Sequence, residues 1–153
     1  MYRRQMLAAA ALPLSAMVAG CIDTIRSSDD DGLETEFELL GATRDHSTED
    51  PPSVVQNDDQ IVVEGAIEFG SGSCSTVELV HAEYEWTQQR IDLLIAAVND
   101  DEGIDAYDGC TMDSSNTSYR AVVSIEGLED VRQVTATEHH KRGEYHSTTR
   151  RIY

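Results

Sequence analysis

CSTVELVHAEYEWTQQRIDLLIAAVNDDEGIDAYDGC, residues 74–110, is the stretch on which the predicted fold depends. Its first part alternates apolar and polar residues, which predicts a strand over residues 76–86. The apolar positions change from odd at Leu79 to even at Ala82. Because a one-residue shift turns side chains to the other face, we expect a β-bulge near residues 80–81.

The second part of this stretch predicts another strand and a covalent bridge. After a turn at residues 87–89, residues 90–98 are apolar on both faces, so this strand is expected in the interior of its sheet. An acidic loop then leads to Cys110. A disulfide between Cys74 and Cys110 would close a loop of about 35 residues and contribute roughly 4 kcal/mol in the chain-entropy model. The alternative is a pair of unlinked, buried thiols.

Five segments outside this hairpin also have the pattern of strands. Each alternates apolar and polar residues between turn-forming sequences: residues 35–43, 60–69, 119–126, 131–139 and 144–150. Residues 44–59 contain Pro51-Pro52 and many charges, so they are predicted to form a loop. These patterns predict an all-β domain. We prefer a single seven-stranded antiparallel β-sandwich of immunoglobulin-like size over a small β-barrel.

The N-terminus has the pattern of an export signal. Arg3 and Arg4 precede an apolar run at residues 6–19, which is too short to cross a hydrocarbon core of about 30 Å as a helix. The run ends in VAGC, which resembles the lipobox of lipoprotein signal peptides, and YRRQML near the start resembles a twin-arginine export motif. The resemblance implies a lipid on Cys21 and an anchor at the extracellular face of the cell membrane. The alternative is an uncleaved amphipathic or core helix.

This signal divides the chain into three predicted parts. Residues 1–20 are the lipoprotein signal peptide, residues 21–32 an acidic tether, and residues 33–153 the β-sandwich domain. The chain has three cysteines. A lipid on one of them, Cys21, leaves an even pair for a disulfide in an oxidising compartment.

The chain is strongly acidic, with 29 Asp and Glu against 11 Lys and Arg, and Lys141 is its single lysine. Such a charge causes self-repulsion at low salt. At molar salt the Debye length falls to about 3 Å and screens this repulsion. The composition resembles that of proteins from extremely halophilic archaea, and the alternative is an acidic protein of an ordinary bacterium. The charge also argues against nucleic acid as a partner.

The sequence from Gln60 onwards is similar to small secreted lipoproteins of extremely halophilic archaea. The shared features are a strand that ends in Gly-rich sequence and Cys74, an Ala-x-Tyr element at residues 82–84, an apolar strand, Cys110, and a strand that begins with Tyr119. The resemblance implies a fold and a location, and it implies no activity.

The three histidines near the last turn, His139, His140 and His146, are candidates for metal binding. With a two-residue turn, His139 would lie opposite His146, and such a pair can bind Zn²⁺ or Cu²⁺ when a third ligand joins it. Glu138 or Glu144 could be that ligand, although the alternation of the strands places both on the other face. The alternative is an ordinary solvated hairpin at the edge of the sheet.

Two other features are candidates for ligand binding or modification. The acidic loop from Asn99 to Asp108 could hold Ca²⁺, although it does not match the EF-hand pattern. Asn116 begins the sequon Asn-Thr-Ser and is a candidate for N-glycosylation. The remaining histidines, His46 and His81, have no partner that the sequence identifies. The basic C-terminal segment 139–153 could bind an anionic envelope component, or it could pair with the domain's own acidic strands.

The chain contains no G-x-S-x-G elbow, Gly-rich phosphate loop, CxxC pair or HExxH motif. We therefore expect a lipid-anchored binding or interaction module of the envelope, which is not an enzyme and needs no cofactor, with an envelope protein or glycan as partner. The alternatives are a metal- or solute-binding accessory lipoprotein and a small extracellular hydrolase, because paired carboxylates can also meet in three dimensions.

Overall fold

The computed structural model describes residues 25–28, 33–42, 45–71, 74–99 and 113–153. Within these ranges the chain forms strands and no helix, as the alternating sequence pattern predicts. The strands are β1 (Ile25–Ser28), β2 (Glu34–Gly41), β3 (Ser53–Asn57), β4 (Gln60–Phe69), β5 (Ser75–Glu85), β6 (Arg90–Asn99), β7 (Ser115–Ser124), β8 (Gln133–His139) and β9 (Tyr145–Arg151).

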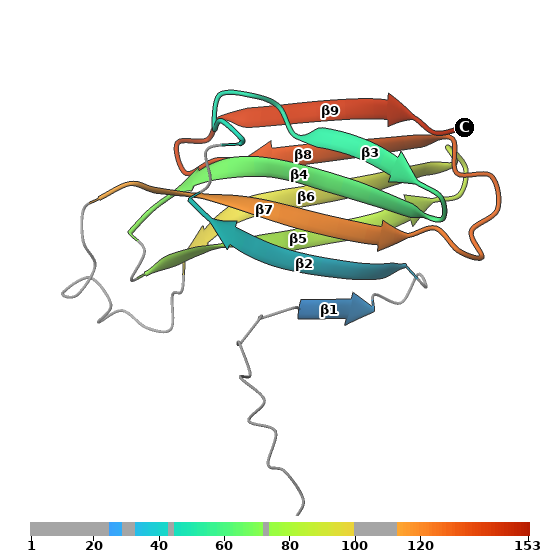
Figure 1. Cartoon of the computed structure of the whole chain (residues 1–153), viewed down its shortest axis with the longest axis horizontal. Helices are drawn as coiled ribbons and strands as arrows, with labels where there is room; N and C mark the ends of the chain where they lie inside the picture. The colour runs from blue at the N-terminus through green and yellow to red at the C-terminus, as the bar shows by residue number, and fades with distance from the viewer. Residues whose placement is uncertain (1–24, 29–32, 43–44, 72–73, 100–112) are drawn as a thin grey trace, which may run out of the picture.

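The strands form two sheets that pack against each other as a β-sandwich (Figure 1). One sheet has the order β1-β2-β7-β4-β3 and the other β5-β6-β8-β9. The predicted all-β sandwich is therefore confirmed, but the prediction of purely antiparallel strands was wrong, because β6 and β8 are parallel. The chain leaves β6, crosses to the first sheet as β7, and returns as β8 in the original direction.

The core lies between the sheets and consists of side chains from alternate strand positions. Each large aliphatic side chain buried in this way contributes about 1.5–3 kcal/mol. The large apolar side chains that are fully buried include Leu33, Ile61, Val63, Ile67, Ile91, Ile95, Tyr119, Val123 and Val134. Tyr119 also stacks on Phe37 of β2, with ring centroids 5.8 Å apart. The aliphatic side chains of β4, β6 and β7 therefore form much of the contact between the two layers.

The hairpin of β5 and β6 has most of the predicted features. The register of β5 and β6 shifts between Leu79 and His81, which is the expected bulge, and β6 lies between β5 and β8. Tyr84 is buried as the alternation predicts. Trp86 is not, because β5 ends at Glu85 and Trp86 lies in the turn, where 62% of it is exposed.

The predicted number of seven strands was too low. Residues 25–28, inside the predicted tether, form β1 and pair with β2. Part of the predicted loop 44–59 forms β3, which pairs with β4. The turn between β3 and β4 is tight and includes Asp58 with a φ of 47°. Asp tolerates this left-handed backbone, so Asp58 and Asp59 form a two-residue hairpin turn between Asn57 and Gln60.

Several predicted features lie wholly or partly outside the described residues. The structure describes Cys74 but neither Cys21 nor Cys110, so the lipid and the disulfide stay predictions. The acidic loop is described only at Asn99. Within the described ranges, the structure has no helix that is long and apolar enough to cross a membrane.

Candidate functional site

The turn between β8 and β9 determines which side chains meet at the candidate site. His140 donates a backbone hydrogen bond to the carbonyl of Glu144 at 2.9 Å, and the amide of Gly143 donates to the carbonyl of His140 at 3.0 Å. Residues 141–143 therefore form the turn. Gly143 has a φ of 80°, which a residue without Cβ adopts at no steric cost.

This three-residue turn shifts the hairpin by one position from the predicted register. Glu138 lies opposite His146, and His139 lies opposite Tyr145. The predicted pairing of His139 with His146 was therefore wrong. The His139 ring stacks on Tyr145 instead, with ring centroids 4.4 Å apart and an angle of 2° between the planes.

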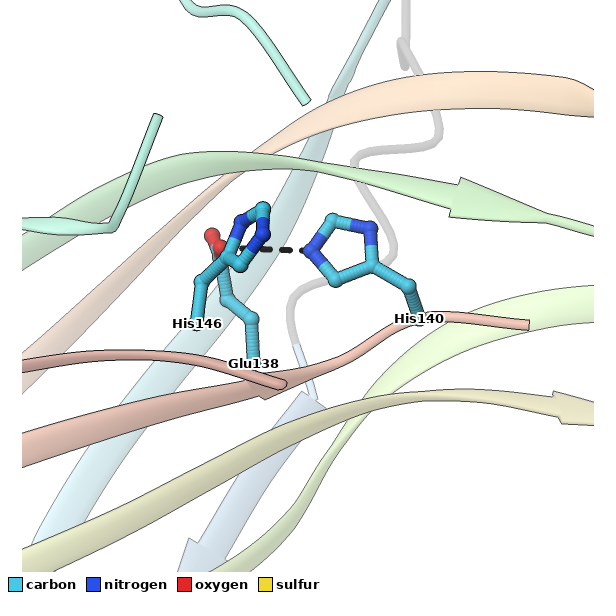
Figure 2. Close-up of side chains that lie close together, drawn as sticks. All are labelled: Glu138, His140 and His146. Atoms are coloured by element: carbon cyan, nitrogen blue, oxygen red, sulfur yellow. Dashed lines mark ion pairs between the residues drawn. The ribbon is translucent and has the colours of Figure 1, made fainter. Parts of the chain in front are cut away.

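Figure 2 shows that Glu138, His140 and His146 come together at this end of the sandwich. One donor or acceptor atom from each residue lies within 4.8 Å of the other two. Nε2 of His140 is 3.5 Å from Oε2 of Glu138, and the two histidine rings have centroids 4.7 Å apart. Glu138 is 0% exposed and His140 is 3% exposed, while His146 is partly buried. The cluster is thus open to solvent mainly on its His146 side.

The carboxylate of Glu138 is held from the opposite sheet. The hydroxyl of Tyr119 in β7 donates a hydrogen bond of 2.7 Å to Oε1 of Glu138. Gly65 of β4 provides the space for this contact, because a Cβ there would lie 2.1 Å from Oε1 of Glu138 and 2.8 Å from the hydroxyl of Tyr119. A lone glycine in a strand interior often marks such a close approach.

The environment changes the proton affinity of Glu138, Tyr119 and His140. Burial raises the pKa of the Glu138 carboxyl to about 7, although the hydrogen bond from Tyr119 acts in the opposite direction. Burial also raises the pKa of Tyr119, and the nearby Glu138 charge adds to this effect. The pKa of His140 is lowered, first by burial and then by His146. Each buried group therefore favours its uncharged form.

His140 and Lys141 also cover an edge of β4 that β3 leaves unpaired. The β3 strand pairs with β4 only as far as Glu64. Further along, the amide of Glu68 donates to Nδ1 of His140 at 3.2 Å, and the amide of Lys141 donates to the carbonyl of Glu68 at 3.1 Å. Because Nδ1 accepts a hydrogen bond, the neutral ring carries its proton on Nε2, which faces Glu138. A hydrogen bond of this kind contributes about 1 kcal/mol.

Three polar atoms of the cluster have no hydrogen-bond partner in the described parts of the chain: Oε2 of Glu138, Nε2 of His140 and Nδ1 of His146. Buried polar groups almost always have a partner, so three such atoms close together indicate a binding site for a water molecule or a small ion. The sequence pattern grouped His140 with His139 and His146, but it paired His146 with His139 and placed Glu138 on the other face.

The other predicted residues are placed separately from this cluster. Asn116 is exposed on β7 and lines a shallow hollow with His46. Nε2 of His46 is 3.8 Å from a Glu64 carboxylate oxygen, and Nε2 of His81 is 3.1 Å from one of Glu83.

The basic C-terminal segment, residues 139–153, makes contacts with the rest of the domain. Nε of Arg142 is 3.5 Å from a carboxylate oxygen of Glu68, and the Arg150 guanidinium donates to the carbonyl of Val54. Part of this segment therefore pairs with the domain itself, which was one of the two alternatives.

Comparison of the chain with protein-family models, with curated proteins and with solved structures finds no match in any of the three.

Proposed function

We propose that this protein is a lipid-anchored binding module of the cell envelope, held at the extracellular face of the membrane through Cys21. The proposal depends on the short distance along the chain between Cys21 and the first strand. The lipobox-like sequence ends at Cys21, and β1 begins at Ile25. Even a fully extended chain covers only about 14 Å over that distance. An anchor at Cys21 would therefore hold the sandwich close to the membrane surface.

A role in binding rather than catalysis is supported by the described part of the domain. The space between the sheets is filled mainly by aliphatic side chains. In contrast, besides Tyr153, two large aromatic side chains of the described residues are exposed: Trp86, at 62%, and Tyr145, at 63%. They lie beside the β5–β6 and β8–β9 turns, at opposite ends of the sandwich (Figure 1). Exposed aromatic residues are frequent anchors of recognition surfaces, and an envelope protein or glycan is the partner that fits the location.

The proposal includes the export route and the covalent bridge. The resemblance to small secreted lipoproteins of halophilic archaea, the twin-arginine-like start and the acidic composition support export into a saline, oxidising environment. A disulfide between Cys74 and Cys110 would form there. In molar salt the acidic surface would be screened and the domain would remain compact.

The anchor is tested by the intact mass and the membrane fractionation of the protein from its own cells. We expect a wild-type chain that begins at Cys21, carries a lipid and stays in the membrane fraction. The Cys21→Ser variant should lose the lipid and leave that fraction. An unprocessed N-terminus on the wild-type chain would refute the proposal.

The binding role is tested by cross-linking in native membranes. We expect the wild-type protein to capture a defined envelope partner. At least one of Trp86→Ala and Tyr145→Ala should reduce this capture, whereas Val80→Ala, which removes an exposed side chain that is not aromatic, serves as the control. If wild-type protein in its own membranes captures nothing, the binding role is wrong, even if the anchor is correct.

A further inference from the structure

The three unpartnered atoms of the cluster are all of the kind that binds transition metals. They are one carboxylate oxygen and two imidazole nitrogens, contributed by Glu138, His140 and His146. Two of the residues, Glu138 and His140, are almost completely buried, so water from the bulk does not replace the missing partners. A set of two imidazoles and one carboxylate suits Zn²⁺, Cu²⁺ or Ni²⁺, whereas Mg²⁺ and Ca²⁺ prefer oxygen ligands alone.

We propose that Glu138, His140 and His146 form a binding site for a divalent transition-metal ion, with Zn²⁺ as the reference ion. Oε2 of Glu138, Nε2 of His140 and Nδ1 of His146 are the three ligand atoms. Three protein ligands leave a fourth tetrahedral position for water or a small ligand, and His146 is the one partly exposed residue of the three. The inference does not depend on the proposed lipid anchor or envelope partner.

The surroundings of the cluster supply the support that metal sites need. Tyr119 holds the second carboxylate oxygen of Glu138 with its hydroxyl, which fixes the direction of the ligand oxygen. Gly65 leaves the space in which this pair fits. One potential ligand atom from each of the three residues lies within 4.8 Å of the other two, and Nε2 of His140 is 3.5 Å from Oε2 of Glu138. Ligands of a tetrahedral Zn²⁺ lie roughly 3.3 Å apart, so a small inward shift completes the site, and His146 is free to make it on the edge strand β9.

One hydrogen bond opposes the metal. A ligating Nε2 must present its lone pair, so the proton of the neutral His140 ring moves to Nδ1. Nδ1 then no longer accepts the amide of Glu68. Binding therefore exchanges a single neutral hydrogen bond for three metal–ligand bonds, and it releases any proton held by the Glu138 carboxyl. The backbone amide of Glu68 is consequently a reporter of metal binding.

The test is a Zn²⁺ titration of the full chain after removal of metals with a chelator, followed by calorimetry. We expect one tight site per chain. His146→Ala should weaken this site about 100-fold or more. His139→Ala is the matched control, because this neighbouring histidine stacks on Tyr145 outside the cluster, and it should leave the affinity unchanged.

Three further readouts separate a built site from ordinary binding to surface carboxylates. Co²⁺ in place of Zn²⁺ should give the visible absorption of a four-coordinate ion, and the amide resonance of Glu68 should shift on binding. Glu138→Gln, which keeps the shape of the side chain, should also lose the tight site, so the test does not depend on one variant. Equal affinity in His146→Ala and wild type, equal weakening by His139→Ala, or the absence of a stoichiometric site would each overturn the proposal and leave an ordered water as the occupant of the cluster.

Discussion

The hydroxyl of Tyr119 lies 2.7 Å from Oε1 of Glu138, and this contact joins the two sheets of the sandwich. Tyr119 belongs to β7 in one sheet and Glu138 to β8 in the other. Both side chains are 0% exposed. A carboxyl group in such a place is unfavourable unless it is hydrogen-bonded. The pair is therefore a polar element of the core with a defined partner, and its surroundings lead to the following predictions.

The first prediction concerns the Tyr119 hydroxyl. Tyr119→Phe should lower the free energy of unfolding by about 1–3 kcal/mol, because it leaves a buried carboxyl oxygen without its donor. Tyr84→Phe is the matched control, since Tyr84 is also buried and donates to the backbone carbonyl of Glu129 at 2.8 Å. Urea denaturation of both variants measures the difference. The pKa of Glu138 should rise further in Tyr119→Phe only, and an equal loss of stability with no change in this pKa would contradict the assigned role.

The second prediction concerns the space beside Glu138. Gly65→Ala should lower the free energy of unfolding by about 1–3 kcal/mol, because the added Cβ overlaps the carboxylate of Glu138. In a Glu138→Ala background the same change should have a smaller effect, since the nearest overlapping atom is absent and only the contact with the Tyr119 hydroxyl remains. Thermal denaturation of the four proteins of this double-mutant cycle measures the coupling. Additive effects would show that the two positions do not compete for space.

The third prediction concerns the pH dependence of the metal-free protein. The pKa of Glu138 is raised from its usual 4.5 to about 7, so between these values the folded chain holds a proton that the unfolded chain releases. This contribution is fully present below pH 4.5 and is lost as the pH rises to 7, a change of about 3 kcal/mol. His140 has a lowered pKa and acts in the opposite direction. The stability of wild type is therefore compared with that of Glu138→Gln, which keeps His140 but lacks the titrating carboxyl.

Urea denaturation with a chelator in molar salt, at pH 4.5 and 7.5, is the measurement for this third prediction. The stability of Glu138→Gln relative to wild type should increase by about 3 kcal/mol between the two values. Parallel pH profiles for the two proteins would show that Glu138 does not titrate differently in the folded chain.

The fourth prediction concerns the bridge between Cys74 and Cys110. The mature protein should have a mass two hydrogens below that of its fully reduced form, and Cys74→Ser should lower the free energy of unfolding by about 4 kcal/mol. Cys110→Ser should have the same effect, and the double variant should be no less stable than either single one. Labelling of both thiols in the native, unreduced protein would exclude the bridge.

The strands were predictable wherever one local pattern was strong. The change of parity between Leu79 and Ala82 is sufficient to place the bulge of β5, because a buried face cannot otherwise continue. The apolar character of residues 90–98 on both faces likewise places β6 inside its sheet. Short strands are harder to predict. The β3 strand has only Val54 and Val55 as its signal, and its pairing with β4 depends on the turn at Asp58.

The candidate site was predictable only in part, because its composition depends on the length of one turn. A two-residue and a three-residue turn are both compatible with the sequence around Gly143, and they differ by one residue in register. That difference decides whether Glu138 or His139 lies opposite His146. The contacts with Tyr119 and Gly65 come from the other sheet, and no local pattern reports them.

The pairing of β1 has a mechanical consequence for a domain attached at its N-terminal side. β1 pairs with β2 over four residues, whereas β4 and β7 pair over ten. A pulling force that enters the chain ahead of Ile25 acts first on the short β1–β2 ladder. This ladder should detach before any strand of the core moves, and the released segment would lengthen the link. The N-terminal edge of the sandwich would thus work as a small extensible element that protects the rest of the domain from load.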